Sequence, residues 1–315
     1  MDPPADLTDF AGRIRRHFPD LVARSVRALP HPGWGGENDA LLVDDALVFR
    51  FPRQPEAARA LAVEVCLLPE LAPLVALPIP RFTHVARDPA TGLPLFVGYP
   101  LIPGEPLTPD RFAALAGDPA TVERLAAGLA AFLTGLHRFP LDRARACGVP
   151  APAGALRKSV AARRDATRAR VYPALAPDER AVVEQIFEGW LGDPRHFAWT
   201  PALCHGDLTS DHILVAARAE RGIAGIIDFG DLTIGDPAGD FVWRFEWGDA
   251  FFRRVLARYR APVGDPAAFA RVVACRYRLM PLHQIAHGLA TGNAADVEEG
   301  RRRLRAGMNG RPVAP

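Results

Sequence analysis

The sequence predicts an α+β protein with a small β-rich lobe followed by a larger, mostly helical lobe. Three short apolar stretches near the N-terminus, at 25–29, 40–43 and 46–51, are separated by turn residues and predict a β-meander. From residue 119 onward, apolar residues recur mainly with helical spacing. This second pattern predicts helices at 119–138, 152–170, 176–191, 249–260 and 265–289.

The first lobe also contains two predicted helices and one further strand. Apolar residues at helical spacing predict helices over 7–18 and 56–71, and the second of these ends before a proline. A strand is predicted over 95–102, closed by a Pro-Gly pair. We therefore place the nucleotide-binding lobe at 1–102 and the helical lobe at 103–315.

The composition is that of an ordinary soluble globular protein. Hydrophobic residues make up 49% of the 315 residues, charged residues make up 23%, and the net charge is +2. A charge this small gives no reason to expect a nucleic-acid partner. Since no apolar run reaches about 18 residues, we expect no contact with a membrane. The acidic, Pro-rich start at Met1–Asp6 does not resemble a signal peptide, and we expect a cytoplasmic protein.

Four cysteines lie far apart in the sequence, at Cys66, Cys147, Cys204 and Cys275. They form no C-x-x-C pair, so their spacing indicates neither a zinc site nor a redox pair. We expect all four to be buried or free thiols in a reducing cytosol.

Two blocks in the second lobe carry the chemistry. The block at 204–215 contains His-Gly-Asp with Asp207, and the block at 225–231 contains Asp228. Two short apolar stretches between these aspartates fit a β-hairpin that brings both loops to one edge. Phosphoryl transfer needs a carboxylate that accepts the proton of the attacking hydroxyl and a ligand that holds magnesium against the phosphates. Asp207 and Asp228 fit these two roles.

These blocks resemble the catalytic and metal loops of the aminoglycoside phosphotransferases, and the HRD and DFG loops of protein kinases are a distant parallel. The chain is most similar to the aminoglycoside 2''-phosphotransferases and is also similar to macrolide phosphotransferases. Both groups place a histidine five residues after the catalytic aspartate, as His212 stands here. Further matches lie upstream of these blocks, at 49–52, 64–65, 77–80 and 102–107. Together with the two blocks, they extend the resemblance over about 30–250.

The resemblance implies a bilobal, protein-kinase-like fold and a small-molecule kinase. The enzyme would transfer the γ-phosphate of GTP or ATP to a hydroxyl group. Asp207 would be the catalytic base, while His212 and Asp228 would hold Mg²⁺. His205 would brace the catalytic loop.

Four residues of the first lobe would form the phosphate site if the resemblance holds. Arg50 stands where most family members have lysine, and Glu64 would pair with it from the following helix. Gly35 and Gly36, in a glycine-rich turn, would cover the phosphates with their backbone N–H groups.

The nucleotide base would lie against the end of the strand over 95–102. By analogy, Tyr99 is the gatekeeper behind the purine, and the Pro100 carbonyl and the Ile102 N–H form the hinge. A bulky tyrosine would crowd adenine in its usual position. We therefore expect GTP as the donor.

An aminoglycoside acceptor is a polycation, so its site should contain carboxylates. The stretch at 240–249 matches an acidic cluster of the 2''-phosphotransferases and keeps Glu246 and Asp249. Asp211 is a third candidate. We expect the two tryptophans of this stretch to pack in the core.

Other functions remain open at this point. A macrolide or another hydroxyl metabolite could replace the aminoglycoside. A metal-dependent hydrolase could use the same histidines and aspartates, although it would need neither the glycine-rich turn nor the Arg50–Glu64 pair. A non-catalytic nucleotide-binding pseudokinase is suggested only by Arg50. We expect a monomer whose partner is a small hydroxyl compound.

Overall fold

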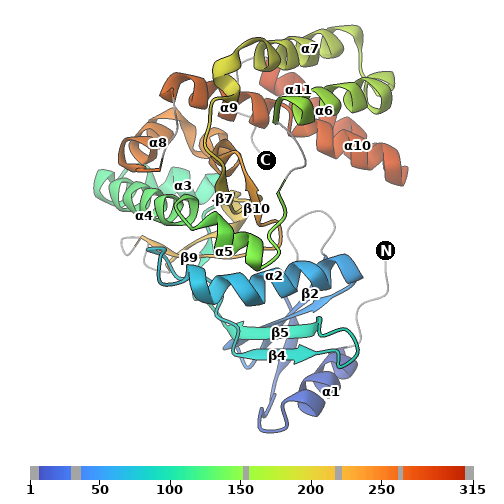
Figure 1. Ribbon diagram of the computed structural model, residues 1–315, viewed down its shortest axis with the longest axis vertical. Coiled ribbons are helices and arrows are strands. Elements are labelled where there is room, and N and C mark those ends of the chain that lie inside the picture. The colour runs from blue at the N-terminus through green and yellow to red at the C-terminus, as the bar shows by residue number, and fades with distance from the viewer. Residues whose placement is uncertain (1–6, 30–36, 152–155, 217–221, 262–264, 309–315) are drawn as a thin grey trace.

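Five antiparallel strands form the sheet of the N-terminal lobe, in the order β1-β2-β3-β5-β4. The computed structural model describes residues 7–29, 37–151, 156–216, 222–261 and 265–308. The strands are β1 (Val26–Ala28), β2 (Asn38–Val43), β3 (Leu47–Pro52), β4 (His84–Arg87) and β5 (Pro94–Pro100). Figure 1 shows this lobe in blue and cyan below the green-to-red helical lobe. The predicted β-meander is confirmed, since β1, β2 and β3 pair in sequence.

Two helices pack on this sheet. The short helix α1 (Leu7–His17) buries Phe10 and Ile14, and the Phe10 ring lies 4.6 Å from that of Phe51 on β3. The longer helix α2 (Pro55–Leu71) begins at a proline, whose missing N–H costs nothing in a first helical turn. The last turns of α2 belong to the core of the helical lobe, through Leu67, Leu68 and Leu71. This helix therefore connects the two lobes.

The C-terminal lobe is mostly helical and contains two small sheets. Its α-helices are α3 (Pro109–Leu115), α4 (Pro119–His137), α5 (Leu141–Ala146), α6 (Leu156–Arg170), α7 (Pro177–Gly192), α8 (Arg244–Arg258), α9 (Pro266–Arg278), α10 (Pro281–Thr291) and α11 (Ala294–Met308). One sheet joins β6 (Glu105–Pro106), β8 (Ile213–Val215) and β9 (Ile223–Ile226), and the other joins β7 (Ala202–Cys204) and β10 (Thr233–Gly235). The expected α+β fold is therefore confirmed.

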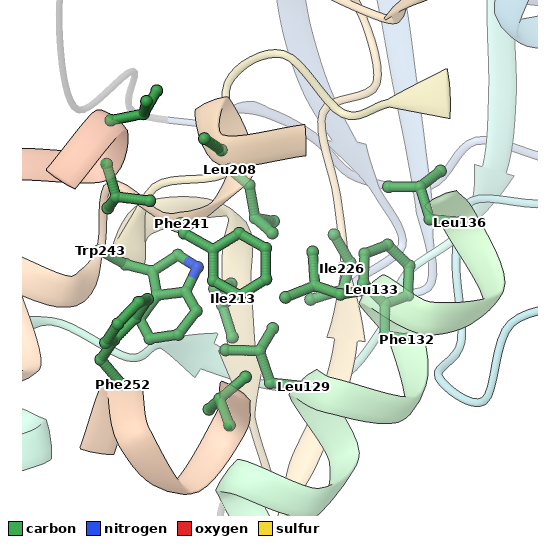
Figure 2. Packing of buried hydrophobic residues seen from close by; sticks show 14 of the residues in the cluster. Leu129, Phe132, Leu133, Leu136, Leu208, Ile213, Ile226, Phe241, Trp243 and Phe252 are labelled. Atoms are coloured by element: carbon green, nitrogen blue, oxygen red, sulfur yellow. The ribbon is translucent and has the colours of Figure 1, made fainter. Parts of the chain in front are cut away.

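A single large apolar core fixes the β8–β9 hairpin against α4. Figure 2 shows Leu129, Phe132, Leu133 and Leu136 of α4 beside Ile213 and Ile226, with Phe241, Trp243 and Phe252 closing the other side. Trp243 is fully buried and Trp247 nearly so, which confirms their expected place in the core. Truncating a buried aromatic of this size typically costs about 3–5 kcal/mol. The hairpin that carries both functional loops is therefore anchored in the large apolar core.

Three helix predictions need correction. The single helix expected over 265–289 is two helices, α9 and α10, because Pro281 has no N–H to continue the ladder. The helix expected over 249–260 begins earlier, at Arg244, and is interrupted at Gly248, whose φ is 83°. The helix α11 was not expected, because its sequence is rich in charge and buries little. Residues 152–155 of another predicted helix lie outside the described residues.

The expectation of four free thiols is wrong for two of them. Cys66 on α2 and Cys147, the residue after α5, form a disulfide with their Cα atoms 5.5 Å apart. Local spacing gave no signal for this bond, because 81 residues separate the partners. Cys204 and Cys275 are free. The bond adds a covalent connection between α2 and the helical lobe.

No described helix is both long and apolar enough to cross a membrane.

Candidate active site

The catalytic loop and the metal loop are hydrogen-bonded to each other. His205 follows β7, and its Nε2–H donates to the carbonyl of Ile227 at 3.0 Å, while its Nδ1 accepts the N–H of Asp207 at 3.3 Å. In return, the N–H of Ile227 donates to the carbonyl of His212 at 3.0 Å. Burial lowers the pKa of His205, which agrees with a neutral ring that donates at one nitrogen and accepts at the other. His205 thus has the bracing position that the sequence suggested.

Close backbone approach explains the glycine in the His-Gly-Asp block. Gly206 has φ +90°, and a Cβ at this position would lie 2.0 Å from the carbonyl oxygen of Asp231. Any side chain would therefore push the two loops apart. Asp228 also has positive φ, at 63°, which is uncommon for a residue other than glycine. The site uses an unusual backbone to aim the Asp228 carboxylate.

Asp240 anchors the catalytic loop by hydrogen bonds to its backbone, and this role was not predicted from the sequence. Its Oδ2 accepts the N–H of His205 at 2.7 Å, and its Oδ1 accepts the N–H of Gly206 at 3.0 Å. His137 lies with Nε2 3.0 Å from Oδ2 and with Nδ1 2.6 Å from the Tyr259 hydroxyl. Burial alone would raise the pKa of Asp240, but the hydrogen bond from His137 and nearby charges outweigh burial and lower it.

One buried cluster has the residue types of a metal site. Ligand atoms of His137, Cys204 and Asp240 lie within 4.8 Å of one another. Hydrogen bonds already use both ring nitrogens of His137 and both oxygens of Asp240. Burial also raises the pKa of the Cys204 thiol, which opposes the thiolate that a metal needs. We therefore interpret this cluster as the support of the catalytic loop.

Asp207, His212 and Asp228 meet at the edge of the hairpin. His212 Nδ1–H donates to the backbone carbonyl of Asp207 at 2.7 Å. This bond leaves the lone pair of Nε2 available, 3.5 Å from Asp228 Oδ2. His212 Nδ1 is also 3.6 Å from Asp207 Oδ2. A base and two potential metal ligands therefore share one small site.

The two aspartates have opposite electrostatic environments. Burial raises the pKa of Asp207, and His212 opposes that rise only in part. Burial would also raise the pKa of Asp228, but the positive charge of Arg50 is the largest of the opposing effects, and the pKa is lowered. A raised pKa suits a group that accepts a proton, and a lowered pKa suits a permanent anion. The environments thus agree with the roles expected from the sequence.

Arg50 connects the N-terminal lobe to the metal loop. Its NH1 donates to both carboxylate oxygens of Glu64, at 3.0 and 2.8 Å, and its NH2 lies 3.4 Å from Asp228 Oδ1. The ion pair expected between Arg50 and Glu64 is thus present. Arg50 is only 7% exposed. Burial alone would lower the pKa of Arg50, but Glu64 and Asp228 outweigh it and keep the guanidinium charged.

The three residues expected around the nucleotide base lie on or just after β5. Tyr99 is buried, and its ring packs edge-on against Phe82 at 5.7 Å. Burial raises the pKa of its hydroxyl to about 12, so the side chain is neutral. Pro100 is opposite Leu47 in the β3–β5 register, and Ile102 follows the end of the strand. Gly35 and Gly36 lie outside the described residues.

The expected acceptor carboxylates divide into two groups. Glu246, in the first turn of α8, accepts the N–H of Ser210 at 3.2 Å and lines a pocket beside the catalytic loop. The charge of Asp211 raises the pKa of both Asp207 and Glu246, although burial is the larger cause in each. Asp249 differs, because Arg244 Nε donates to its Oδ1 at 2.7 Å. Asp249 therefore already has a cationic partner in Arg244, and its expected role in acceptor binding stays a prediction.

A catalytic loop and a metal loop on one hairpin, with an Arg–Glu pair from a β-rich lobe, define a kinase-like phosphotransferase. The model of the phosphotransferase enzyme family APH matches residues 29–272. The chain therefore belongs to this family, whose members transfer phosphate to hydroxyl groups.

Solved structures agree with this assignment. The GDP and kanamycin complex of APH(2")-IIIa has 32% sequence identity to this chain and a TM-score of 0.86, covering 96% of this chain and 99% of that one. The GDP complex of a wild-type aminoglycoside 2'-phosphotransferase-IIIa has 31% identity and a TM-score of 0.85, covering 95% and 97%. The macrolide 2'-phosphotransferase MphH from Brachybacterium faecium, with 24% identity and a TM-score of 0.69 over 93% and 97%, shares the fold.

Proposed function

We propose that this enzyme transfers the γ-phosphate of GTP or ATP to a hydroxyl of an aminoglycoside, with 2''-type regiochemistry. The observation that carries the proposal is the meeting of Asp207, His212 and Asp228 at one edge of a hairpin, with Arg50 beside Asp228. The similarity to a kanamycin-binding structure over nearly the whole chain supports the choice of acceptor.

Asp207 is the proposed base. The acceptor hydroxyl oxygen attacks the γ-phosphorus, the bond from that phosphorus to the bridging oxygen of the β-phosphate breaks, and the nucleoside diphosphate leaves. Asp207 accepts the hydroxyl proton, and its raised pKa favours this acceptance. Glu246 and Asp211 are the proposed carboxylates for the ammonium groups of the acceptor.

The residues present fit a magnesium ion between the loops and the phosphates. Asp228 offers a carboxylate whose lowered pKa keeps it anionic, and His212 offers a free lone pair at Nε2. Magnesium in phosphotransfer sites is commonly held by one or two carboxylates together with substrate phosphates. When bound, the ion neutralises charge on the β- and γ-phosphates.

The lobe at 1–102 is the proposed nucleotide site. Arg50, oriented by Glu64, binds phosphate oxygens, and the turn containing Gly35 and Gly36 covers them. The hinge at Pro100 and Ile102 offers one carbonyl and one N–H to the purine edge. Because Tyr99 fills the space behind the purine, we propose GTP as the preferred donor.

We further propose that the enzyme acts as a monomer in the cytoplasm, where nucleoside triphosphates are available. Its partners would be the nucleotide and a small hydroxyl acceptor, without a role for nucleic acid or a membrane. The Cys66–Cys147 disulfide would then depend on the redox state of that compartment.

The test combines a substrate panel with Asp207→Asn. Wild-type enzyme with GTP, Mg²⁺ and kanamycin should form a phosphorylated product whose position ³¹P and ¹H NMR can assign. Asp207→Asn should lose about 10²–10⁴-fold in kcat while its nucleotide Kd stays close to wild type. The control Asp110→Asn changes an exposed carboxylate of α3 and should keep full activity.

Two results would contradict the proposal in different ways. Phosphorylation of a macrolide or a neutral metabolite, with no reaction on kanamycin or gentamicin, would contradict the acceptor. Turnover of Asp207→Asn within about threefold of wild type would contradict the mechanism, since a general base is typically worth far more.

A further inference from the structure

A pocket between α7, α8, α9 and α11 opens beside the catalytic loop. Its polar lining includes Glu246 from α8, Tyr277 and Arg278 from α9, and Arg303 from α11. Glu246 Oε2 accepts the N–H of Ser210, three residues after the catalytic base. This hydrogen bond joins the pocket wall to the catalytic loop, so we place one part of the acceptor in the pocket and its reacting hydroxyl at the loop.

The charges of this pocket do not match those of a simple polycation site. Glu246 is the carboxylate of the lining, the charge of Arg303 acts on it, and Arg278 also lines the pocket. An acceptor with many ammonium groups would gain attraction at Glu246 and meet repulsion at the arginines. The pocket therefore favours an acceptor portion with few ammonium groups and several oxygen atoms.

Arg303 has donors that its protein neighbours do not use. Its NH1 makes one long hydrogen bond, to Gln284 Oε1 at 3.5 Å, and its Nε is buried without a partner among the described residues. Among the described residues, Arg303 forms no ion pair. Burial raises the pKa of Glu246, and the positive charge of Arg303 opposes part of that rise. Buried donors without partners are uncommon in folded proteins. The NH2 group of this guanidinium has no hydrogen-bond acceptor among the described residues, and a ligand oxygen would supply one.

We infer that Arg303 is a specificity-determining residue for the acceptor, an inference that rests on the proposed function. The pocket takes an amino-sugar ring that places a single ammonium group at Glu246 and hydroxyl oxygens at Arg303. A second ammonium group on that ring meets the guanidinium of Arg303 and is disfavoured. Arg303 thus selects among aminoglycosides by charge, without taking part in phosphoryl transfer.

Kanamycin A and kanamycin B form a matched pair of probes for this inference. They differ at one position of one ring, where kanamycin B has an ammonium group in place of a hydroxyl. Wild-type enzyme should show a higher kcat/KM for kanamycin A. Arg303→Gln should raise the ratio of kanamycin B to kanamycin A by about tenfold, the size of one like-charge contact in a partly solvated pocket.

Two control variants distinguish selection of the acceptor by the charge of Arg303 from a general structural effect. Arg303→Lys keeps the charge and should leave the ratio near that of wild type. Arg302→Gln removes a neighbouring arginine whose side chain is 57% exposed and paired with Glu299, and it should also leave the ratio unchanged. A change in kcat that is equal for both acceptors would show only a structural role.

The possible failures are distinguishable. If wild-type enzyme phosphorylates both kanamycins and Arg303→Gln leaves their ratio unchanged, the inference about Arg303 is overturned and the proposed function stands. If neither kanamycin nor any other aminoglycoside is phosphorylated with GTP or ATP, the proposed function fails and this inference fails with it.

Discussion

The guanidinium of Arg50 lies 3.4 Å from the carboxylate of Asp228, although 178 residues separate them in the chain. Since the same guanidinium also binds Glu64, one side chain connects strand β3, helix α2 and the metal loop. Arg50 stays charged because Glu64 and Asp228 outweigh the effect of burial on its pKa. The rigid guanidinium fork suits this position, because different N–H groups can serve different partners.

Arg50→Ala should raise the nucleotide KM and lower kcat. A charge-assisted hydrogen bond typically contributes about 1.5–3 kcal/mol, so the combined loss in kcat/KM for the nucleotide should be about ten- to a hundredfold. Arg50→Lys should recover part of the loss, because a lysine retains the charge but not the fork. Steady-state kinetics with varied GTP and ATP measure these effects. Full activity of Arg50→Ala would remove the residue from the site.

Arg50 and Glu64 should behave as a pair in a double-mutant cycle. Glu64→Ala leaves the buried guanidinium without its closest partner, and Arg50→Ala leaves a buried carboxylate uncompensated. The double variant should therefore lose less in kcat/KM than the sum of the two single losses. Strict additivity would indicate that the observed ion pair does not matter for nucleotide use.

Asp240→Asn should disrupt the catalytic loop while sparing nucleotide binding. An amide has one acceptor oxygen and cannot replace both oxygens, which accept the N–H groups of His205 and Gly206. A buried donor left without its partner costs about 1–3 kcal/mol, and we expect a loss of that size in the free energy of unfolding. kcat should fall, whereas the nucleotide Kd should change little because Arg50 is not touched.

Asp236→Asn is the matched control for Asp240→Asn. Asp236 is also buried and bonded, but its partners are Arg276 and the N–H of Ala238, not the catalytic loop. This variant should lower stability in urea denaturation while kcat remains near wild type. An equal fall of kcat in both variants would mean that Asp240 acts only through global stability.

The sequence predicted the local parts of the site and missed the long-range ones. The catalytic and metal loops are short blocks whose residue order is visible without the fold. The partners of Asp240 lie 34 and 35 residues upstream, so nothing in the local pattern distinguishes this aspartate from a turn residue. The Cys66–Cys147 bond was missed for the same reason, because its two cysteines are far apart in the sequence and meet only in the folded protein.

The single helix predicted over 265–289 was wrong although a local signal against it was present. Pro281 divides α9 from α10, and its ring alone could have shown that the predicted helix ends there. Asp249 is adjacent to Gly248, whose φ of 83° interrupts α8. Arg244 pairs with Asp249 across this interruption. The acidic stretch of the sequence therefore contributes only Glu246 to the pocket.

The raised pKa of Asp207 predicts loss of activity in mild acid. Burial raises this pKa above the ordinary 3.8, and Asp228 and Asp211 add to the rise. The carboxylate accepts a proton only when ionised, so kcat/KM should be fully present above the raised pKa and fall as the pH drops through it. Asp211→Asn removes a negative charge and should move this acid limb to lower pH. If the acid side of the pH profile were the same in Asp211→Asn as in the wild type, the titrating group would not be Asp207.

The Cys66–Cys147 disulfide should stabilise the protein without setting its nucleotide affinity. The bond closes a loop between partners 81 residues apart, and bonds of this kind typically contribute about 2–4 kcal/mol to the free energy of unfolding. Cys66 is exposed, so a reductant can reach the bond. The nucleotide KM should change little on reduction, because Leu67, Leu68 and Leu71 still hold α2 in the core.

Thiol labelling and denaturation test this bond in the native enzyme purified without reductant. Under denaturing conditions two of the four cysteines should react with a maleimide, and all four should react after reduction. Urea denaturation should show lower stability with reductant for the wild type. The double variant Cys66→Ser/Cys147→Ser should lose this dependence on reductant, whereas Cys275→Ser should keep it, since that thiol is free. Four reactive thiols before any reduction would show that the bond does not form. The helix α2 would then depend on apolar packing and on the Arg143–Glu70 ion pair to hold Glu64 against Arg50.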